Sequence, residues 1–244
     1  MSLMDSTEKM RRDRTLIEEL IEDPSRLGPD FQPIKRLADS TVIAYKATGR
    51  GQTGTDLDST LALLSSAQSS GLVERLDWAF RCLAFDVASD AAVAAEVHLT
   101  PEPETFSSPC PPRLATSFGR GRRALKVGAE VHEAAFAHPG LDAAVQEWRG
   151  WGWRVIVADV AHLYDAALMR QLGQLRPDVV QVDLSKPARD TDAGVREILA
   201  WANGTGVEIH ALGVDSDARR EQALALGAVA GRGRLLGYPA PLAA

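Results

Sequence analysis

Short apolar segments alternate with amphipathic stretches from Ala95 onward, and this alternation is the feature that most restricts the fold. The apolar segments show no regular polar face, so they predict strands buried on both sides, as in a parallel sheet covered by helices. The expected strands are residues 95–99, 124–128, 154–160, 179–184, 208–212 and 228–230. The expected helices are residues 140–150, 164–175, 193–203 and 216–226.

Two further apolar runs, residues 31–34 and 41–45, are separated by the turn-forming residues Ala38-Asp39-Ser40 and predict an antiparallel hairpin. Helical patterns follow at residues 57–67 and 72–87. With the later strands, the hairpin brings the total to about eight, which favours an α/β fold of the TIM type, a (β/α)8 barrel with an antiparallel first strand. An open doubly wound sheet is the alternative that the pattern leaves open.

The first residues have a different character from the rest of the chain. Residues 1–27 are dense in charge and carry apolar side chains at helical spacing until Asp23-Pro24 interrupts the pattern. We therefore expect an N-terminal lead-in helix within residues 1–27, ahead of a barrel domain at residues 28–244.

Composition argues against several classes of function. The formal net charge of -6 and the pI of about 5.4 disfavour a binder of nucleic acid or anionic membrane. No run approaches the roughly 18 apolar residues of a membrane span. The two cysteines, Cys82 and Cys110, make neither a disulfide framework nor a zinc site, which indicates a reducing, cytoplasmic setting. The five histidines lack the spacing of metal ligands.

Several short motifs occur in the order and spacing of one known family. Phe31-Gln32-Pro33-Ile34, followed by Ala44-Tyr45-Lys46-Ala47-Thr48-Gly49-Arg50, resembles the opening of the EAL family of cyclic-di-GMP phosphodiesterases, in which Gln-Pro-Ile precedes Gly-Tyr-Glu-Ala-Leu-Leu-Arg. Later segments resemble the family's Asn-containing strand end, its Asp-Asp-Phe-Gly, Leu-Lys-Ile-Asp and Glu-Gly-Val-Glu motifs and its closing segment; they are residues 99–105, 155–160, 180–183, 211–216 and 227–239. The resemblance implies a barrel whose functional groups lie at the C-terminal ends of the strands.

The family reaction is attack of water on a phosphodiester bond of cyclic-di-GMP, assisted by two divalent cations that oxygen ligands hold. By this resemblance, most positions of that site have changed in this chain. The metal-ligand positions are Lys46, Thr100, Val127, Ala158 and Leu212, where the family has Glu, Asn, Glu, Asp and Glu. The catalytic lysine and the late glutamine are replaced by Gln181 and Arg232. A shifted alignment would put Glu130 in place of Val127.

Carboxylates remain at Asp159, Asp183 and Asp215, but one retained aspartate of the paired motif cannot assemble two metal sites. We therefore expect no catalytic residue, no bound metal and no cofactor. We expect Lys46 to replace the missing metal charge by pairing with Asp159 or Asp183.

Four residues are candidates for binding a ligand: Gln32, Arg50, Asp183 and Arg232. The simpler interpretation is that Arg50 pairs with Asp183 inside the barrel mouth. The basic cluster at residues 119–123 is expected to be a solvated loop, and Trp148, Trp151 and Trp153 are expected to fill the core.

These substitutions predict a degenerate, catalytically inactive EAL domain of bacterial signalling that acts through a protein partner or as a homodimer, with the lead-in helix as the contact element. Two alternatives stay open. The domain would be a non-hydrolysing cyclic-di-GMP receptor, or it would be an active phosphodiesterase or another enzyme with residual activity.

Overall fold

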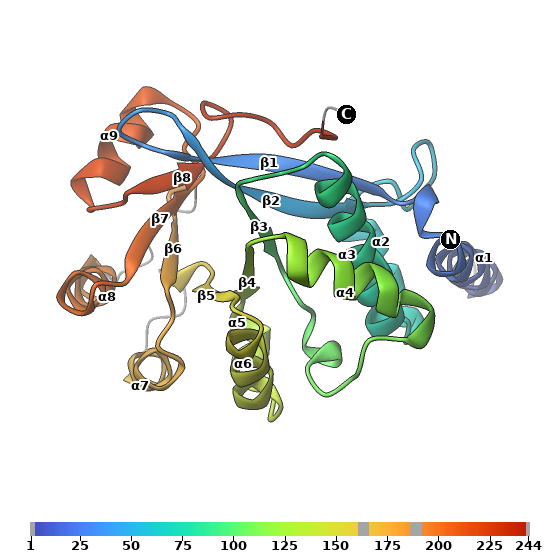
Figure 1. Ribbon diagram of the computed structural model, residues 1–244. Helices are drawn as coiled ribbons and strands as arrows, with labels where there is room; N and C mark the ends of the chain where they lie inside the picture. Colours follow the sequence, from blue (N-terminus) through green and yellow to red (C-terminus); the bar gives the residue numbers. More distant parts are fainter. Residues whose placement is uncertain (1–2, 161–165, 186–191, 243–244) are drawn as a thin grey trace.

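The computed structural model describes residues 3–160, 166–185 and 192–242, and within this part of the chain the strands form one closed barrel in sequence order (Figure 1). The first strand runs antiparallel to both of its neighbours, and every other pairing around the barrel is parallel. The strands are β1 (Gly28–Arg36), β2 (Val42–Arg50), β3 (Glu96–Leu99), β4 (Val127–Val131), β5 (Arg154–Val157), β6 (Val179–Asp183), β7 (Glu208–Leu212) and β8 (Ala230–Arg232).

Helices surround the barrel, and Figure 1 shows α6 to α9 on the outside of the later strands. The helices are α1 (Leu3–Glu22), α2 (Thr60–Ser70), α3 (Val73–Asp90), α4 (Ala115–Ala124), α5 (Glu133–Phe136), α6 (Leu141–Gly150), α7 (Ala166–Leu175), α8 (Asp192–Thr205) and α9 (Asp217–Ala225). Short 3-10 turns lie at Pro24–Arg26, Pro103–Thr105 and Pro112–Leu114.

The predicted TIM-like barrel with an antiparallel first strand is confirmed, and the open doubly wound sheet is excluded. The hairpin strands extend further than the apolar runs indicated. Their pairing continues beyond those runs, from Gly28 opposite Arg50 to Lys35 opposite Val42.

One region differs from the sequence-based expectation. Residues 119–123 belong to helix α4 and are not a solvated loop, and β4 begins three residues later than predicted. Helix α4 carries few apolar residues, so its pattern is weak, but it buries Phe118 and Gly121 against the side chain of Phe85 in α3. Packing of this narrow buried face against α3 therefore stabilises a helix that the local sequence pattern does not predict.

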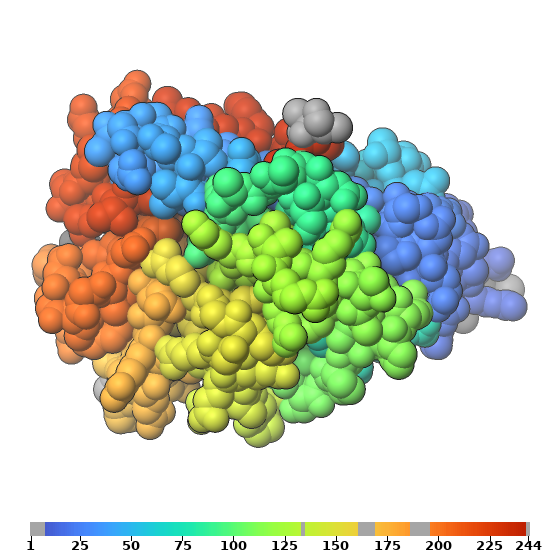
Figure 2. Space-filling view, viewed as in Figure 1, coloured from blue at the N-terminus to red at the C-terminus, as the bar shows by residue number. Residues whose placement is uncertain are grey.

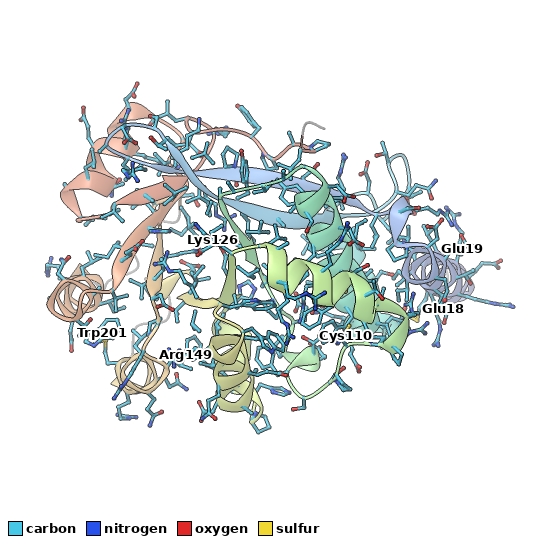
Figure 3. The ribbon with its side chains drawn as sticks, in the orientation of Figure 1. Glu18, Glu19, Cys110, Lys126, Arg149 and Trp201 are labelled. Atoms are coloured by element: carbon cyan, nitrogen blue, oxygen red, sulfur yellow. The ribbon has the colours of Figure 1, made fainter. Side chains whose placement is uncertain are left out.

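Helix α1 ends at Glu22, just before Asp23-Pro24, as the sequence indicates. Its apolar stripe, which includes Ile17, Leu20 and Ile21, is fully buried against α2 and α3. Figure 2 shows the N-terminal segment in dark blue at one edge of the molecule. Glu18 and Glu19, labelled in Figure 3, keep partly exposed carboxylates, so the free surface of α1 is charged.

The main apolar core lies between the sheet and its helices. Trp148 and Trp153 are buried there, while Trp151 is only partly buried and packs edge-on against Trp153 and Phe118. Cys82 and Cys110 are both free thiols. No helix in the described part of the chain has the length and apolar content to cross a membrane.

The interior of the barrel is unusually polar. Barrels of this type are normally filled by layers of branched apolar side chains. Here Lys46, His98, Glu130, Gln181 and His210 are all buried. Their mutual contacts form the candidate site.

Gly121 provides a test of the α3–α4 packing. An added methyl group would collide with the ring and Cβ of Phe85, so Gly121→Ala is expected to lower the free energy of unfolding by about 1–3 kcal/mol, measured by urea denaturation. Gly119→Ala on the same helix is the matched control, because its methyl group would meet only the mobile end of Arg123 and should raise stability through helix propensity. Equal effects of the two substitutions would contradict this packing.

Candidate functional site

A buried ion pair joins Lys46 of β2 to Glu130 of β4 inside the barrel. The Lys46 Nζ lies 2.6 Å from Glu130 Oε2, and the two side chains are only 9% and 2% exposed. The same ammonium group donates a hydrogen bond to Thr100 Oγ1 at the end of β3. Lys46 therefore does occupy the barrel mouth, but the carboxylate that it pairs with is Glu130, and the predicted pairing with Asp159 or Asp183 is wrong.

Other side chains complete the shell around the Glu130 carboxylate. Gln181 Nε2 donates to Oε1 over 2.9 Å, and His98 Nδ1 lies 3.3 Å from the same oxygen. Thr100 Oγ1 lies 3.4 Å from Oε2. On its other side, His98 Nε2 lies 2.7 Å from Glu96 Oε1, so the imidazole ring bridges two carboxylates. A ring in this position is best satisfied as an imidazolium, which donates from both nitrogens.

The shifts in pKa agree with an ionised Glu130 carboxylate at the centre of this network. Burial alone would raise the pKa of Glu130, but the Lys46 ammonium, the contact with His98 and the Arg232 guanidinium hold it well below its ordinary value. Burial alone would lower the pKa of His98, and the contacts with Glu130 and Glu96 reverse that effect and raise it. Burial lowers the pKa of Lys46, although Glu130 opposes the shift.

Strand register explains why these side chains meet. Lys46 is paired with His98 and His98 with Gly128 across neighbouring parallel strands, and alternate residues of a strand face the same side. Glu130, two residues after Gly128, therefore faces the interior. Val127 faces the opposite way and belongs to the apolar core outside the sheet, so Glu130, and not Val127, is the side chain that β4 presents to the barrel interior.

A cleft of about 340 Å³ lies at the C-terminal mouth, and we call it the C-terminal cleft. Lys46, Thr100 and Arg232 form its barrel side, and Leu63 and Phe80 of α2 and α3 form its apolar wall. It thus combines two cationic groups with an apolar surface, which is the composition of a site for an anion that carries a flat or apolar body.

Acidic groups also reach this cleft from α3 and the loop after β3. Asp77 and Arg81 form a buried ion pair, and Arg81 also donates to Thr105 Oγ1 over 2.9 Å. Nearby, burial raises the pKa of Glu102 to about 7, the Asp77 and Glu104 carboxylates add to the shift, and Lys46 opposes it. Glu102 is therefore partly protonated at neutral pH.

Two of the candidate ligand-binding residues are engaged elsewhere. Arg50 lies 3.4 Å from Asp30 and 3.9 Å from Asp58, so its predicted pairing with Asp183 is wrong. Gln32 donates from Nε2 to the Gly237 carbonyl over 3.0 Å and so joins β1 to the segment after β8.

The remaining predicted positions lie around the mouth without converging on one centre. Ala158 is buried directly after β5, and Leu212 ends β7. Asp183 Oδ1 accepts hydrogen bonds from the backbone and hydroxyl of Ser185. Asp215 Oδ1 accepts from the Arg234 backbone, and this bond, ahead of the nearby arginine charges, lowers its pKa.

Asp159 follows Ala158 in the left-handed backbone region with φ 54°, at the mouth of the barrel. The segment 161–164, which the resemblance equates with the end of the Asp-Asp-Phe-Gly loop, falls outside the described residues.

This donor set does not fit divalent cations. The ammonium of Lys46 lies directly on the Glu130 carboxylate at the centre of the network, and a cation there would be repelled. Within the part of the chain that the structure describes, no group of three or more His, Cys, Asp or Glu side chains could hold a metal ion.

The sequence indicates Glu130 only as an alternative to Val127, and it assigns no role in the site to His98 or Glu96. The available signal was the spacing of Glu96-Val97-His98 and Glu130-Val131-His132, in which polar residues alternate with a buried valine. Such alternation on two neighbouring strands places the polar side chains on one face.

The chain is similar to known proteins over most of its length. Residues 15–239 match the sequence model of the family described as EAL domain. No curated protein matches.

Solved structures share the fold at low sequence identity. The Xanthomonas citri FimX EAL domain in complex with c-diGMP has a TM-score of 0.80 at 17% identity, and the match covers 98% of this chain and 97% of that one. The PaMucR phosphodiesterase in its c-di-GMP complex has a TM-score of 0.76 at 20% identity, with 96% and 98% covered. The Bacillus subtilis YkuI protein, with an EAL domain in complex with substrate c-di-GMP and calcium, has a TM-score of 0.77 at 15% identity, with 93% and 58% covered.

The buried ion pair predicts a strong energetic coupling. Lys46→Met should lower the free energy of unfolding by about 3 kcal/mol, because it leaves the Glu130 charge buried with fewer partners. Adding Glu130→Gln should recover more than half of that loss, measured as a double-mutant cycle in urea. Lys9→Met removes an exposed pair with Asp13 and should cost less than about 1 kcal/mol. Additive losses at Lys46 and Glu130 would argue against the pair.

Glu102 predicts a pH dependence of stability. Its pKa rises from 4.5 to about 7 on folding, so the folded state holds this proton more tightly than the unfolded state. Its contribution to stability should therefore fall as pH rises from 4.5 to 7. Glu102→Gln should become progressively more stable relative to the parent across this window, followed by urea titrations at several pH values. Glu147→Gln on the exposed face of α6 should follow the parent curve.

Proposed function

The chain belongs to the EAL domain family, and from this premise we propose that it is a catalytically inactive member that acts in signalling by binding a protein partner. The observation that carries the proposal is the Lys46 ammonium seated on Glu130. A divalent cation at this place would lose its carboxylate ligand and would meet a positive charge at contact distance.

The other half of the family chemistry is also missing. Hydrolysis needs a group that positions or deprotonates water, and Gln181 has no basic atom at neutral pH. Its amide instead donates to Glu130, so it serves the buried network. The Gln181 amide is therefore bonded to Glu130, and Glu130 is also paired with Lys46.

Exposed apolar side chains support a protein as the partner. Leu61 at the start of α2 is 77% exposed, and Leu235 and Tyr238, after β8, are 41% and 67% exposed. These segments follow the C-terminal ends of β2 and β8, so a partner that covers the mouth would bury them. The apolar stripe of α1 is covered within the chain, which leaves that helix a mostly charged surface for contact, with Met10 exposed on it. A second copy of the chain would meet the same surface as a homodimer.

A cyclic-di-GMP receptor is the second candidate, and Arg232 favours it. Its Nε is buried and has no hydrogen-bond partner among the described residues, while the side chain lines the C-terminal cleft beside Lys46. An anionic ligand would supply the missing acceptor. The relatives named above carry this nucleotide in their structures, at less than 25% identity.

The proposal also includes the cellular compartment. Free thiols at Cys82 and Cys110 suit a reducing compartment, so we place the domain in the cytoplasm.

Hydrolysis of cyclic-di-GMP tests the central claim. With Mg²⁺ or Mn²⁺ present, the protein is expected to release no linear dinucleotide above a blank without enzyme, by chromatography. Lys46→Glu is expected to remain inactive, because Leu212, Ala158 and Gln181 still lack the required groups. Turnover by the parent would refute inactivity, and turnover by the variant would refute the correspondence of the other positions.

Calorimetric titration with cyclic-di-GMP separates the two candidates. The leading proposal expects no binding in the micromolar range, with or without Mg²⁺. Tight binding without turnover, weakened by Arg232→Gln, would replace the protein-partner proposal with the receptor.

A further inference from the structure

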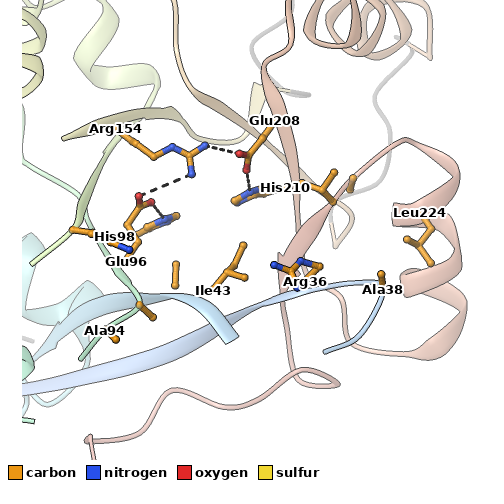
Figure 4. A pocket seen from close by; sticks show the side chains of 15 residues that line it. Arg36, Ala38, Ile43, Ala94, Glu96, His98, Arg154, Glu208, His210 and Leu224 are labelled. Carbon is orange, nitrogen blue, oxygen red and sulfur yellow. Dashed lines mark hydrogen bonds and ion pairs between the residues drawn. The ribbon is translucent and has the colours of Figure 1, made fainter. Parts of the chain in front are cut away.

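The end of the barrel opposite the C-terminal cleft is hollow. A cavity of about 700 Å³ opens at the N-terminal ends of the parallel strands, and we call it the N-terminal cavity (Figure 4). Its size falls in the range of small-molecule sites, and neither the family chemistry nor the proposed partner surface uses it. In a barrel of this type the corresponding end is normally closed by packed side chains.

Small side chains create the hollow. Alanines occupy the positions that would otherwise fill it, at Ala44 in β2, Ala94 and Ala95 before β3, and Ala228 before β8. The hairpin turn adds Ala38, labelled in Figure 4 across the cavity from Ala94. The hollow is thus a property of the sequence at several separate strands.

The floor of the cavity is a closed network of charges. Arg154 lies between two carboxylates, 3.0 Å from Glu208 and 4.0 Å from Glu96 (Figure 4). Each of these carboxylates also contacts the histidine two residues further along its strand, Glu96 with His98 over 2.7 Å and Glu208 with His210 over 3.0 Å. Both acidic groups therefore already share the Arg154 charge and each contacts a histidine, and a ligand gains little from replacing these partners.

The rim carries positive charge that is not neutralised in this way. Lys126, labelled in Figure 3 just before β4, is exposed, and its ammonium group has no hydrogen-bond or ion-pair partner among the described residues. The Arg36 guanidinium pairs with Asp39 over 2.8 Å, and both side chains are about half exposed. Since exposed pairs of this kind are weak, its guanidinium can also serve a ligand.

Apolar side chains, some of them partly exposed, also line the cavity. Ile43 lies inside it, and Leu224 of α9 and Val229 remain 46% and 48% exposed at its edge. Large apolar side chains at the lip of a cavity contribute binding energy when a ligand covers them.

From this arrangement we propose that the N-terminal cavity binds a small organic monoanion with an apolar body, such as a medium-chain carboxylate. The apolar body lies against Ile43, Leu224 and Val229, and the carboxylate accepts hydrogen bonds from Lys126 and Arg36. A cationic ligand is disfavoured by the same two groups, and a metal ion is disfavoured because the floor carboxylates are held by Arg154 and the histidines.

Calorimetric titration with octanoate tests this site on the intact protein. Octanoate is expected to bind with one site per chain, and octanol, which has the same apolar body without the charge, is expected to bind at least about fivefold more weakly. Equal affinity for the two compounds, or no binding of octanoate, would overturn the proposal.

Variants locate the site. Lys126→Glu should weaken octanoate binding at least about fivefold while octanol binding changes little. Arg170→Glu, an equal change of charge at an exposed position of α7, is the control and should leave the affinity unchanged. Ala94→Phe fills the opening at an exposed position and should weaken both compounds. Thermal melts establish that each variant is folded, and octanoate binding unaffected by both Lys126→Glu and Ala94→Phe would place the ligand elsewhere.

Discussion

The buried ion pair between Lys46 and Glu130 is the constraint on which the interior of this barrel depends. A carboxylate removed from water is tolerated only when charges and hydrogen bonds replace its hydration. The surrounding side chains meet that need, since Gln181 and His98 engage one oxygen of Glu130 while Lys46 and Thr100 engage the other. Lys46, Glu130 and Gln181 are thereby held together in the interior of the barrel.

The charge contacts that begin at Glu130 continue along the barrel axis. His98 carries the contact from Glu130 to Glu96, and Arg154 carries it on to Glu208 at the opposite end. Charges alternate in sign along this chain, so each one is neutralised by its neighbours and no large net charge accumulates in the interior. The two ends of the barrel are joined by one electrostatic network, which replaces part of the usual apolar layering.

The architecture was accessible from sequence, whereas the centre of the site was not. Strand and helix periodicity together with the hairpin turn lead to the barrel and its antiparallel first strand, because these signals are local. The start of β4 was predicted three residues too early, since the weak apolar pattern of α4 hid the preceding helix. Val127 and Glu130 are an odd number of residues apart and therefore face opposite sides of the strand, and the structure shows that Glu130 is the one inside the barrel. The partners of Lys46 and Arg50 depend on contacts between distant strands, which residue types alone do not determine.

The reversed direction of β1 has a further consequence for how this protein can change. The turn at Ala38-Asp39-Ser40 joins two strands directly, and Figure 1 shows it beside α9, while every later strand is reached through a helix that must keep its own packing. With Ser40 at φ 61° and its neighbours Ala38, Asp39 and Thr41 exposed, this turn can accept a grafted or lengthened loop as long as Leu37, whose carbonyl accepts from Arg220 of α9, stays in place. This turn is therefore a suitable position at which to add a new recognition element to the domain.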